Sequence, residues 1–265
     1  MLRFPSTDFG GASVKRSVLT FLISGILSVS SAYSQGTFGQ IAYGGCWQTA
    51  FTLVNASTAT VAKGNFSFYG DGGSLITAPV QGAGHVSSYQ FTVPANGTES
   101  VVLSSSDPDI TQGWASMSIT AGAVRAQGTL RCQPPGGPAF EAVVPLSTSA
   151  TTECIIPIPA SASPAILIPF DNTGDHSTAV ALANTTNAAL LVPVEFDDQS
   201  GAVLAKDSLS LAAMNHSAFY TSNNYPPVAG KKGVVRIGAS GAQLTVLALL
   251  FNATGGFTTI LPLPF

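Results

Sequence analysis

The sequence predicts an all-β chain in which two antiparallel β-sandwich domains follow one another behind an N-terminal export signal. Turn-forming residues recur about every 8 to 12 positions after Gln35, and the segments between them alternate apolar and polar residues. The same series of motifs occurs twice along the chain. Only 9% of the residues are charged while 45% are hydrophobic, which is typical of a neutral, hydroxyl-rich β-protein and not of a disordered chain.

Residues 1–34 are expected to form a signal peptide. Lys15 and Arg16 precede an apolar run from Val18 to Val29, and Ala32-Tyr33-Ser34 forms a small-x-small cleavage site. A retained membrane anchor is the alternative, but a helix of about twelve residues rises only ~18 Å against a hydrocarbon core of ~30 Å. We therefore expect a secreted, periplasmic or cell-surface protein with no membrane span after cleavage.

The clearest strand signals lie in the first half of the mature chain. Asn65-Phe66-Ser67-Phe68 places both phenylalanines on one face, and every second residue of the segment Val124–Cys132 is polar. Prolines lie where these strands should stop, because proline cannot donate a hydrogen bond to a ladder. They are Pro79, Pro94, Pro108 and the run Pro134–Pro138.

The repeat is seen by aligning the two halves. Thr49–Ser57 aligns with Thr178–Thr186, so that Asn55 falls on Asn184. Further matches follow in the same order, which is hard to obtain by chance in a chain without a low-complexity period. They pair Phe66–Phe68 with Val194–Phe196, Gly73–Ile76 with Gly201–Leu204, Gly113–Ala115 with Gly233–Val235, the strand starting at Val124 with that starting at Leu244, and Val143–Leu146 with Ile260–Leu263.

These matches predict a first domain over 35–146, a linker rich in Pro, Ser and Thr over 147–165, and a second domain over 166–265. Each domain has about a hundred residues and about seven or eight strands, the size of an immunoglobulin-like sandwich. One continuous barrel is the competing architecture, because barrels of about 200 residues or more occur as single domains.

The cysteines predict one disulfide. Cys46 opens a strand and Cys132 closes another, so their ends can meet if the strands are antiparallel. A bridge from Cys132 to Cys154 is the rival pairing. No CxxC pair with companion histidines is present, so no zinc site is expected.

The segment Asp171–His176 is the one acidic cluster that contains a histidine, and its oxygens could bind calcium. It lacks the carboxylate spacing of an EF-hand, and Asx and Gly residues are equally typical of a turn. We expect the turn, hence no metal ligand, and we expect His85, His176 and His216 to be exposed loop residues.

Glu195, Asp197 and Asp198 could be read as the carboxylates of a glycoside hydrolase. Alternation places Glu195 and Asp197 on the solvent face beside a turn, which favours a hairpin end. No Gly-x-Ser-x-Gly elbow, phosphate-binding glycine loop or HExxH helix occurs. The sequence therefore predicts that the protein is not an enzyme and has neither a catalytic residue nor a cofactor.

Trp47 shares its alternation phase with Phe51 and Leu53, which predicts that it lies in the core. Trp114 is out of phase with Met117 and Ile119, so its burial stays open. Six Asn-x-Ser/Thr triplets could carry glycans, although such triplets also arise by chance in this composition. They start at Asn55, Asn65, Asn96, Asn184, Asn215 and Asn252.

The stretches Gly44-Gly45-Cys46-Trp47-Gln48-Thr49 and Leu53-Val54-Asn55 carry a resemblance. With them the chain resembles uncharacterised exported tandem β-sandwich (immunoglobulin-like) repeat proteins of environmental bacteria, whose units open with such stretches. The resemblance covers both halves in outline, but the Gly-Gly-x-Trp part is missing from the second. It implies the fold and the compartment, and no activity.

We therefore expect a non-catalytic structural, adhesion or interaction module with an unknown protein or glycan partner. A carbohydrate-binding module that uses exposed Tyr43, Tyr89 or Tyr225 is the alternative, and an extracellular hydrolase is the third possibility. Nucleic acid is not an expected partner, because the densest basic cluster is only Lys231, Lys232 and Arg236.

Overall fold

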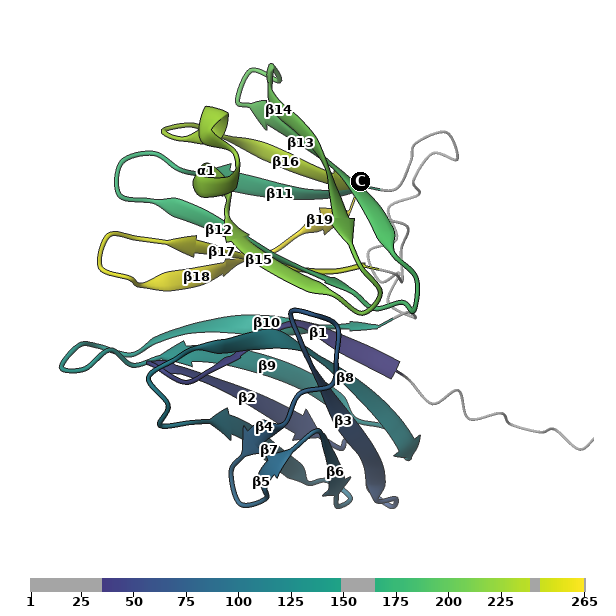
Figure 1. Cartoon of the computed structure of the whole chain (residues 1–265). Helices are drawn as coiled ribbons and strands as arrows, with labels where there is room; N and C mark the ends of the chain where they lie inside the picture. The colour runs from purple at the N-terminus through teal and green to yellow at the C-terminus, as the bar shows by residue number, and fades with distance from the viewer. Residues whose placement is uncertain (1–34, 149–164, 239–243, 265) are drawn as a thin grey trace, which may run out of the picture. The chain divides into compact units, whose positions relative to one another are not determined.

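The computed structural model describes residues 35–148, 165–238 and 244–264, and they form an all-β protein with antiparallel sheets (Figure 1). The strands of the first half are β1 (Gln35–Tyr43), β2 (Trp47–Val54), β3 (Ala62–Gly70), β4 (Ala78–Val80), β5 (Gly84–Val86), β6 (Ser88–Val93), β7 (Thr98–Ser104), β8 (Thr111–Ala121), β9 (Arg125–Cys132) and β10 (Phe140–Thr148). Those of the second half are β11 (Ala165–Asp171), β12 (Ser177–Asn184), β13 (Leu190–Asp198), β14 (Val203–Leu211), β15 (His216–Tyr220), β16 (Lys232–Gly238), β17 (Leu244–Phe251), β18 (Phe257–Ile260) and β19 (Leu263–Pro264). The short helices α1 (Thr221–Asn224) and η1 (Pro226–Val228) lie between β15 and β16.

The strands of the first half form one ten-stranded sheet, in the order β5-β4-β7-β2-β9-β10-β1-β8-β3-β6. Strand β10 connects the two parts of this sheet. It pairs with β9 as far as Pro145 and with β1 from Leu146 onwards. The two layers expected of a sandwich are therefore joined through β10, and the sheet is nearly barrel-like.

The strands of the second half form two sheets. One has the order β14-β13-β16-β11-β19 and the other the order β15-β12-β17-β18 (Figure 1). The last strand changes partner here too, because Ile260 still pairs with β17 whereas Leu263 pairs with β11. In this half Leu261 and Pro262 interrupt the strand, so the two layers stay separate.

The two halves use one pairing scheme. In the first half β1 lies between β8 and β10, β2 between β7 and β9, and β3 between β6 and β8. In the second half β11 lies between β16 and β19, β12 between β15 and β17, and β13 between β14 and β16. The hairpin β4–β5 belongs to the first half alone, and α1 with η1 to the second.

Equivalent buried threonines tie the first two strands of each half together. The Thr49 hydroxyl accepts a hydrogen bond from the Ala42 amide and donates one to the Ala42 carbonyl, both at 2.8 Å. Thr178 bonds the amide and the carbonyl of Asp171 in the same way, at 2.9 and 3.1 Å. Neither threonine is exposed to solvent, so both positions aligned in the sequence perform the same structural task.

Candidate functional site

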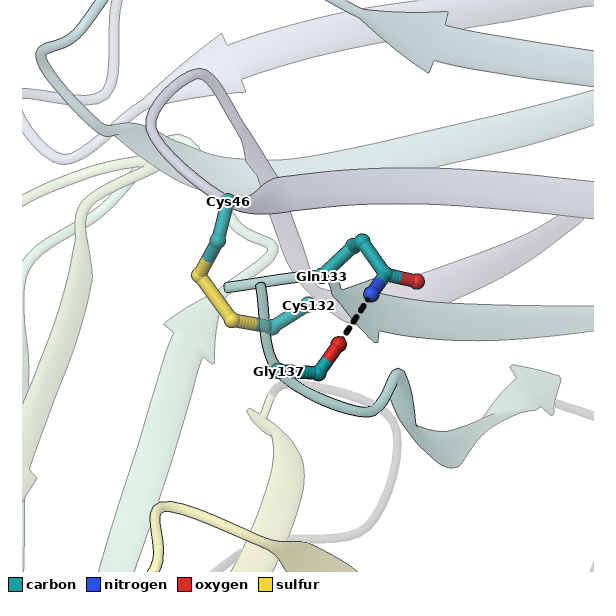
Figure 2. Close-up of a disulfide and its surroundings, with 4 residues drawn as sticks. All are labelled: Cys46, Cys132, Gln133 and Gly137. Atoms are coloured by element: carbon teal, nitrogen blue, oxygen red, sulfur yellow. Dashed lines mark hydrogen bonds between the residues drawn. A yellow bond between two sulfur atoms is a disulfide. The ribbon is translucent and has the colours of Figure 1, made fainter. Parts of the chain in front are cut away.

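The predicted disulfide between Cys46 and Cys132 is confirmed, with Cα atoms 4.7 Å apart (Figure 2). Trp47 pairs with Cys132 in the ladder, so the start of β2 and the end of β9 lie side by side as expected. The Gln133 amide donates to the Cys46 carbonyl at 2.9 Å, and the Gln133 side chain donates to the carbonyl of Gly137 at 2.6 Å. The rival bridge from Cys132 is therefore wrong, and Cys154 lies outside the described residues.

The three carboxylates considered for glycoside hydrolysis are held in structural contacts. Glu195 pairs with Lys206 on the neighbouring strand at 2.7 Å. Asp197 pairs with Arg236 at 2.6 Å. Asp198 accepts hydrogen bonds from Ser200 and the Ala202 amide, which lower its pKa. Each acid thus stabilises a strand pair or a turn.

The prediction that Asp197 faces solvent is wrong, because this residue is only 5% exposed. The register between β13 and β14 shifts at this point because Leu204 of β14 is left unpaired, whereas the pairing of β13 with β16 continues without a shift. Asp197 therefore keeps the face that alternation gives it, and it is buried by what lies against that face, including Arg236.

The acidic loop after β11 is built around hydrogen bonds. Asp171 accepts bonds from the Thr173 amide and hydroxyl and pairs with Lys232 at 2.9 Å. Burial opposes ionisation of this carboxyl, but the bonds from Thr173 and Lys232 outweigh it and lower the pKa of Asp171 to about 2. Asn172 is buried and bonded to Thr221. Among the described residues no three His, Cys, Asp or Glu side chains are grouped closely enough to hold a metal ion.

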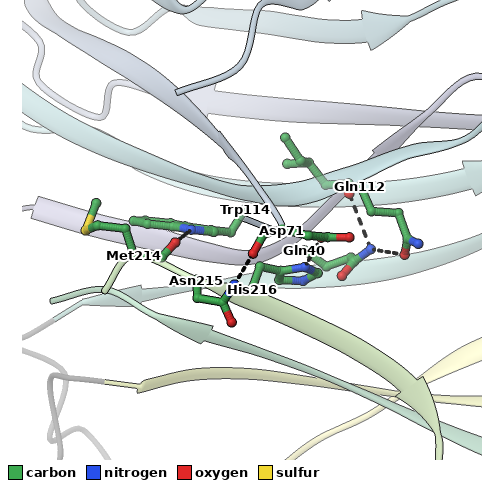
Figure 3. Close-up of polar contacts among 8 residues, drawn as sticks. Gln40, Asp71, Gln112, Trp114, Met214, Asn215 and His216 are labelled. Atoms are coloured by element: carbon green, nitrogen blue, oxygen red, sulfur yellow. Dashed lines mark hydrogen bonds and ion pairs between the residues drawn. The ribbon is translucent and has the colours of Figure 1, made fainter. Parts of the chain in front are cut away.

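The expectation of three exposed histidines holds for His85 and His176, and it is wrong for His216, which is 3% exposed. Nδ1 of His216 lies 2.7 Å from Oδ1 of Asp71, which belongs to the turn after β3 in the other half (Figure 3). The His216 amide also donates to the Asp71 carbonyl at 3.1 Å, and the Asn215 side chain donates to that same oxygen. This polar cluster joins the two halves.

Trp114 is buried by the same contact. Its indole Nε1 donates to the Met214 carbonyl at 2.8 Å (Figure 3), and its ring stacks on Tyr69 with centroids 4.3 Å apart. Met214 has a positive φ of 59°, rare for a residue with a side chain. The out-of-phase position of Trp114 thus reflects burial on the outer face of its sheet, which sequence alternation alone could not identify.

Trp47 also contacts the second half. It is half-buried at the edge of the first core, and its ring stacks on Phe257 of β18 at 5.0 Å. The prediction of a core position is therefore only partly met, because the ring lies where the first core meets residues of the second half.

The tyrosines proposed for sugar binding are not free platforms. Tyr43 and Tyr225 are 6% and 7% exposed, so the expectation that they are exposed is wrong. Tyr89 is half-buried, and its hydroxyl donates to Glu99 at 3.1 Å. Burial, together with the hydrogen bond to the nearby negative charge of Asp207, raises the pKa of the Tyr225 hydroxyl.

Two of the six glycosylation triplets start at buried residues, because Asn55 and Asn184 are 1% and 0% exposed. A glycan on either nitrogen is incompatible with this fold. The triplets at Asn96 and Asn252 start at exposed positions.

A cavity of about 270 Å³ lies where the sheets of the two halves face each other. Strands β1, β2, β8 and β9 line it from one side and strands β12, β15 and β17 from the other. Its polar side chains include Gln40 and Gln112, and its aromatic ones Trp47, Tyr220 and Phe251. This cavity and the polar cluster around Asp71 and His216 form the candidate functional site.

Comparison with protein-family models, with curated proteins and with solved structures gives no match for this chain. Across the described ranges, no helix is both long and apolar enough to cross a membrane.

Proposed function

We propose that this chain is an exported, non-catalytic β-sandwich protein that serves as a structural, adhesion or interaction module at the cell surface, in the periplasm or outside the cell. Removal of residues 1–34 leaves two copies of one immunoglobulin-like unit, of the kind seen in exported bacterial tandem β-sandwich proteins. The shared pairing scheme of the two halves supports the duplication. The Cys46–Cys132 bridge supports an oxidising compartment.

The observation that carries the proposal is the continuity of the first core into the second half. In β12, Val180 and Leu182 pack into the second core, whereas Ala181 between them packs against the first. Leu247, Leu249 and Phe257 join the first core as well. Such an apolar contact holds both units in one arrangement and favours a fixed platform over two freely moving domains.

Strands β9 and β17 occupy equivalent places in the two units, but on one of their equivalent faces only β17 carries apolar side chains. The ladder places Gly128 opposite Phe51 and Ala248 opposite Val180, so β9 and β17 can be compared residue by residue. Where β17 has Leu247, Leu249 and Phe251, the equivalent positions of β9 are Gln127, Thr129 and Arg131. The apolar residues of β17 lie at the contact between the halves, whereas Gln127 and Arg131 of β9 are exposed. Stacking is thereby restricted to the two units of one chain.

A partner would then bind the loops and the edge strands. Strands β6 and β14 lie at equivalent sheet edges, where no further strand of the described residues pairs with their outer side. A protein or glycan partner fits these edges and their loops better than nucleic acid does.

Export and the absence of catalysis are tested on the chain produced with its leader in a bacterium. We expect fractionation to place it outside the cytoplasm, and mass spectrometry to find Gln35 as the first residue and an intact Cys46–Cys132 bridge. We expect no turnover of a panel of glycoside, ester and peptide substrates. Turnover that disappears in Glu195→Gln or Asp197→Asn would overturn the proposal, as would retention in the cytoplasm.

A glycan array probes the adhesion role directly. Specific binding of one sugar class that is lost in Tyr220→Ala, and kept in Tyr89→Phe, would replace the structural role by a carbohydrate-binding one. Tyr220 is the variant of choice because it is 40% exposed.

A further inference from the structure

The cavity between the two halves has the features of a small-molecule site. Its floor contains buried Ala42, Ala181 and Leu247, whereas Ile110, Gln112 and Tyr220 at its mouth are exposed. The volume of about 270 Å³ is close to the lower end of the range for ligand pockets, which suits a molecule of one or two rings.

One lining residue carries a buried polar atom that has no hydrogen-bond partner among the described residues. Gln40 is 6% exposed, and its Nε2 donates to the Ile41 carbonyl at 3.3 Å and to Oε1 of Gln112 at 3.1 Å (Figure 3). Oε1 of Gln40 accepts no hydrogen bond within the described part of the chain. Both hydrogens of the Gln40 amide already bond to carbonyl oxygens, those of Ile41 and of the Gln112 side chain. Exchanging the positions of the amide nitrogen and oxygen would place the Gln40 oxygen against these two oxygens and would gain no hydrogen bond. This oxygen has almost no accessible surface, so a hydrogen-bond donor from outside the chain would satisfy it after a small rotation of the Gln40 side chain towards the cavity.

The rest of the lining selects for an uncharged and largely apolar body. All fifteen lining residues are neutral, so a charged group would lose its hydration without a counter-charge. Trp47 and Phe251 offer aromatic surfaces, and the small side chains of Ala179 and Ala218 leave room beside them. Flat rings pack well against such walls.

We propose that this cavity binds a small uncharged molecule with a flat apolar body and one hydroxyl or N–H group, which donates a hydrogen bond to Oε1 of Gln40. The site goes beyond the structural role proposed above and does not depend on it. Because both halves supply its walls, occupancy would also strengthen the contact between them.

A matched pair of probes tests the donor requirement. The hydroxyl of 2-naphthol can donate to Gln40, whereas 2-methoxynaphthalene has a similar ring body and no donor. We expect calorimetric titration of the mature protein to show saturable binding of 2-naphthol, about tenfold tighter than that of the ether, the usual value of one hydrogen bond. Gln40→Met should remove this preference and keep the weak apolar binding.

Filling the cavity gives a second test with a matched control. Ala218 pairs with Ala181, as Ser100 pairs with Thr52 at the equivalent place in the first half. Ala218→Trp should abolish binding of both probes. Ser100→Trp adds the same ring to a strand of the first half that does not line the cavity, and it should leave binding unchanged.

Fluorine NMR of the wild-type protein tests the proposed site without any substitution, so its result does not depend on whether a variant folds. The chain contains two tryptophans, and Trp47 lines the cavity whereas Trp114 does not. With 5-fluorotryptophan in the wild-type protein, 2-naphthol should shift the Trp47 signal and leave that of Trp114 in place. Absence of saturable 2-naphthol binding, a larger shift at Trp114, or a preference that survives in folded Gln40→Met would overturn the proposal.

Discussion

Asn55 directly follows β2 and Asn184 ends the equivalent strand β12, and the two residues make the same hydrogen bonds in the two halves of the chain. Each side-chain nitrogen donates to three backbone carbonyls, and each side-chain oxygen accepts from the amide two residues later. The carbonyls are those of Thr60, Val93 and Pro94 for Asn55, and those of Ala188, Leu211 and Ala212 for Asn184. One buried amide in each half thus closes two loops onto the end of a strand.

Replacing either asparagine should therefore destabilise the protein strongly. We expect Asn55→Ala and Asn184→Ala each to lower the free energy of unfolding by about 2–4 kcal/mol, because several buried carbonyls lose their donor. Asn→Asp should cost at least as much, since a carboxylate donates no hydrogen bond. Urea denaturation of the mature chain measures both effects. Asn223→Ala at an exposed site in α1 is the control, and a loss of similar size there would contradict this explanation.

The alignment of the two halves in the sequence identified this pair, and it identified Thr49 and Thr178 as well. Strand content and the disulfide were also predictable, because alternation and the placement of cysteines at strand ends are local signals. The sequence could not show that Trp114 is covered by Met214, or that His216 meets Asp71. Alternation tells which residues share a face of a sheet, but not what lies against that face.

Glycines at equivalent places allow two strands to approach closely in each half. A Cβ atom on Gly113 would collide with the Tyr69 carbonyl oxygen, and one on Gly233 with the Asp197 carbonyl oxygen. Both contacts are with backbone, which cannot move away cheaply. We expect Gly113→Ala and Gly233→Ala each to cost about 2 kcal/mol or more in unfolding free energy.

Gly72 provides the control for this prediction. A Cβ there would meet no atom within 4 Å, and the residue is exposed. Gly72→Ala should leave stability unchanged or raise it by a few tenths of a kcal/mol, because alanine restricts the unfolded chain. Thermal and urea unfolding of the three variants side by side decide the point; equal effects at all three sites would contradict it.

The disulfide should contribute to stability through the unfolded state. The bridge spans a sequence separation of 86 residues, for which the chain-entropy account gives about 4.6 kcal/mol. We expect the double variant Cys46→Ala/Cys132→Ala to lose about 2–4 kcal/mol of unfolding free energy in urea. Wild-type protein unfolded with and without reductant gives an independent value, and a bridge worth less than about 1 kcal/mol in both experiments would contradict the prediction.

Trp114 provides a test of the contact between the halves. Trp114→Phe keeps an aromatic ring on Tyr69 but removes the indole N–H, which leaves the Met214 carbonyl without this donor. We expect a loss of about 1–3 kcal/mol. Trp47→Phe, which keeps a ring on Phe257 at a half-buried position, should cost less. Urea denaturation followed by circular dichroism compares both variants, and the reverse order would show that the indole bond does not help to hold the halves together.

Asp171 should make stability depend on acid pH. Its folded-state pKa of about 2 lies below the value of ~3.9 expected for the unfolded chain. The ionised carboxylate therefore stabilises the fold fully above about pH 5, and this stabilisation is lost as the pH falls towards 2. Asp171→Asn should lower the unfolding free energy by about 1 kcal/mol at pH 7, a modest value because Lys232 is 46% exposed. The difference between variant and wild type should shrink towards zero near pH 2.

Asp175→Asn, at an exposed position of the same turn, controls for the loss of one negative charge. Urea titrations from pH 7 to pH 2 measure the change, and an Asp171→Asn difference that stays constant over this range would show that ionisation of Asp171 does not stabilise the fold.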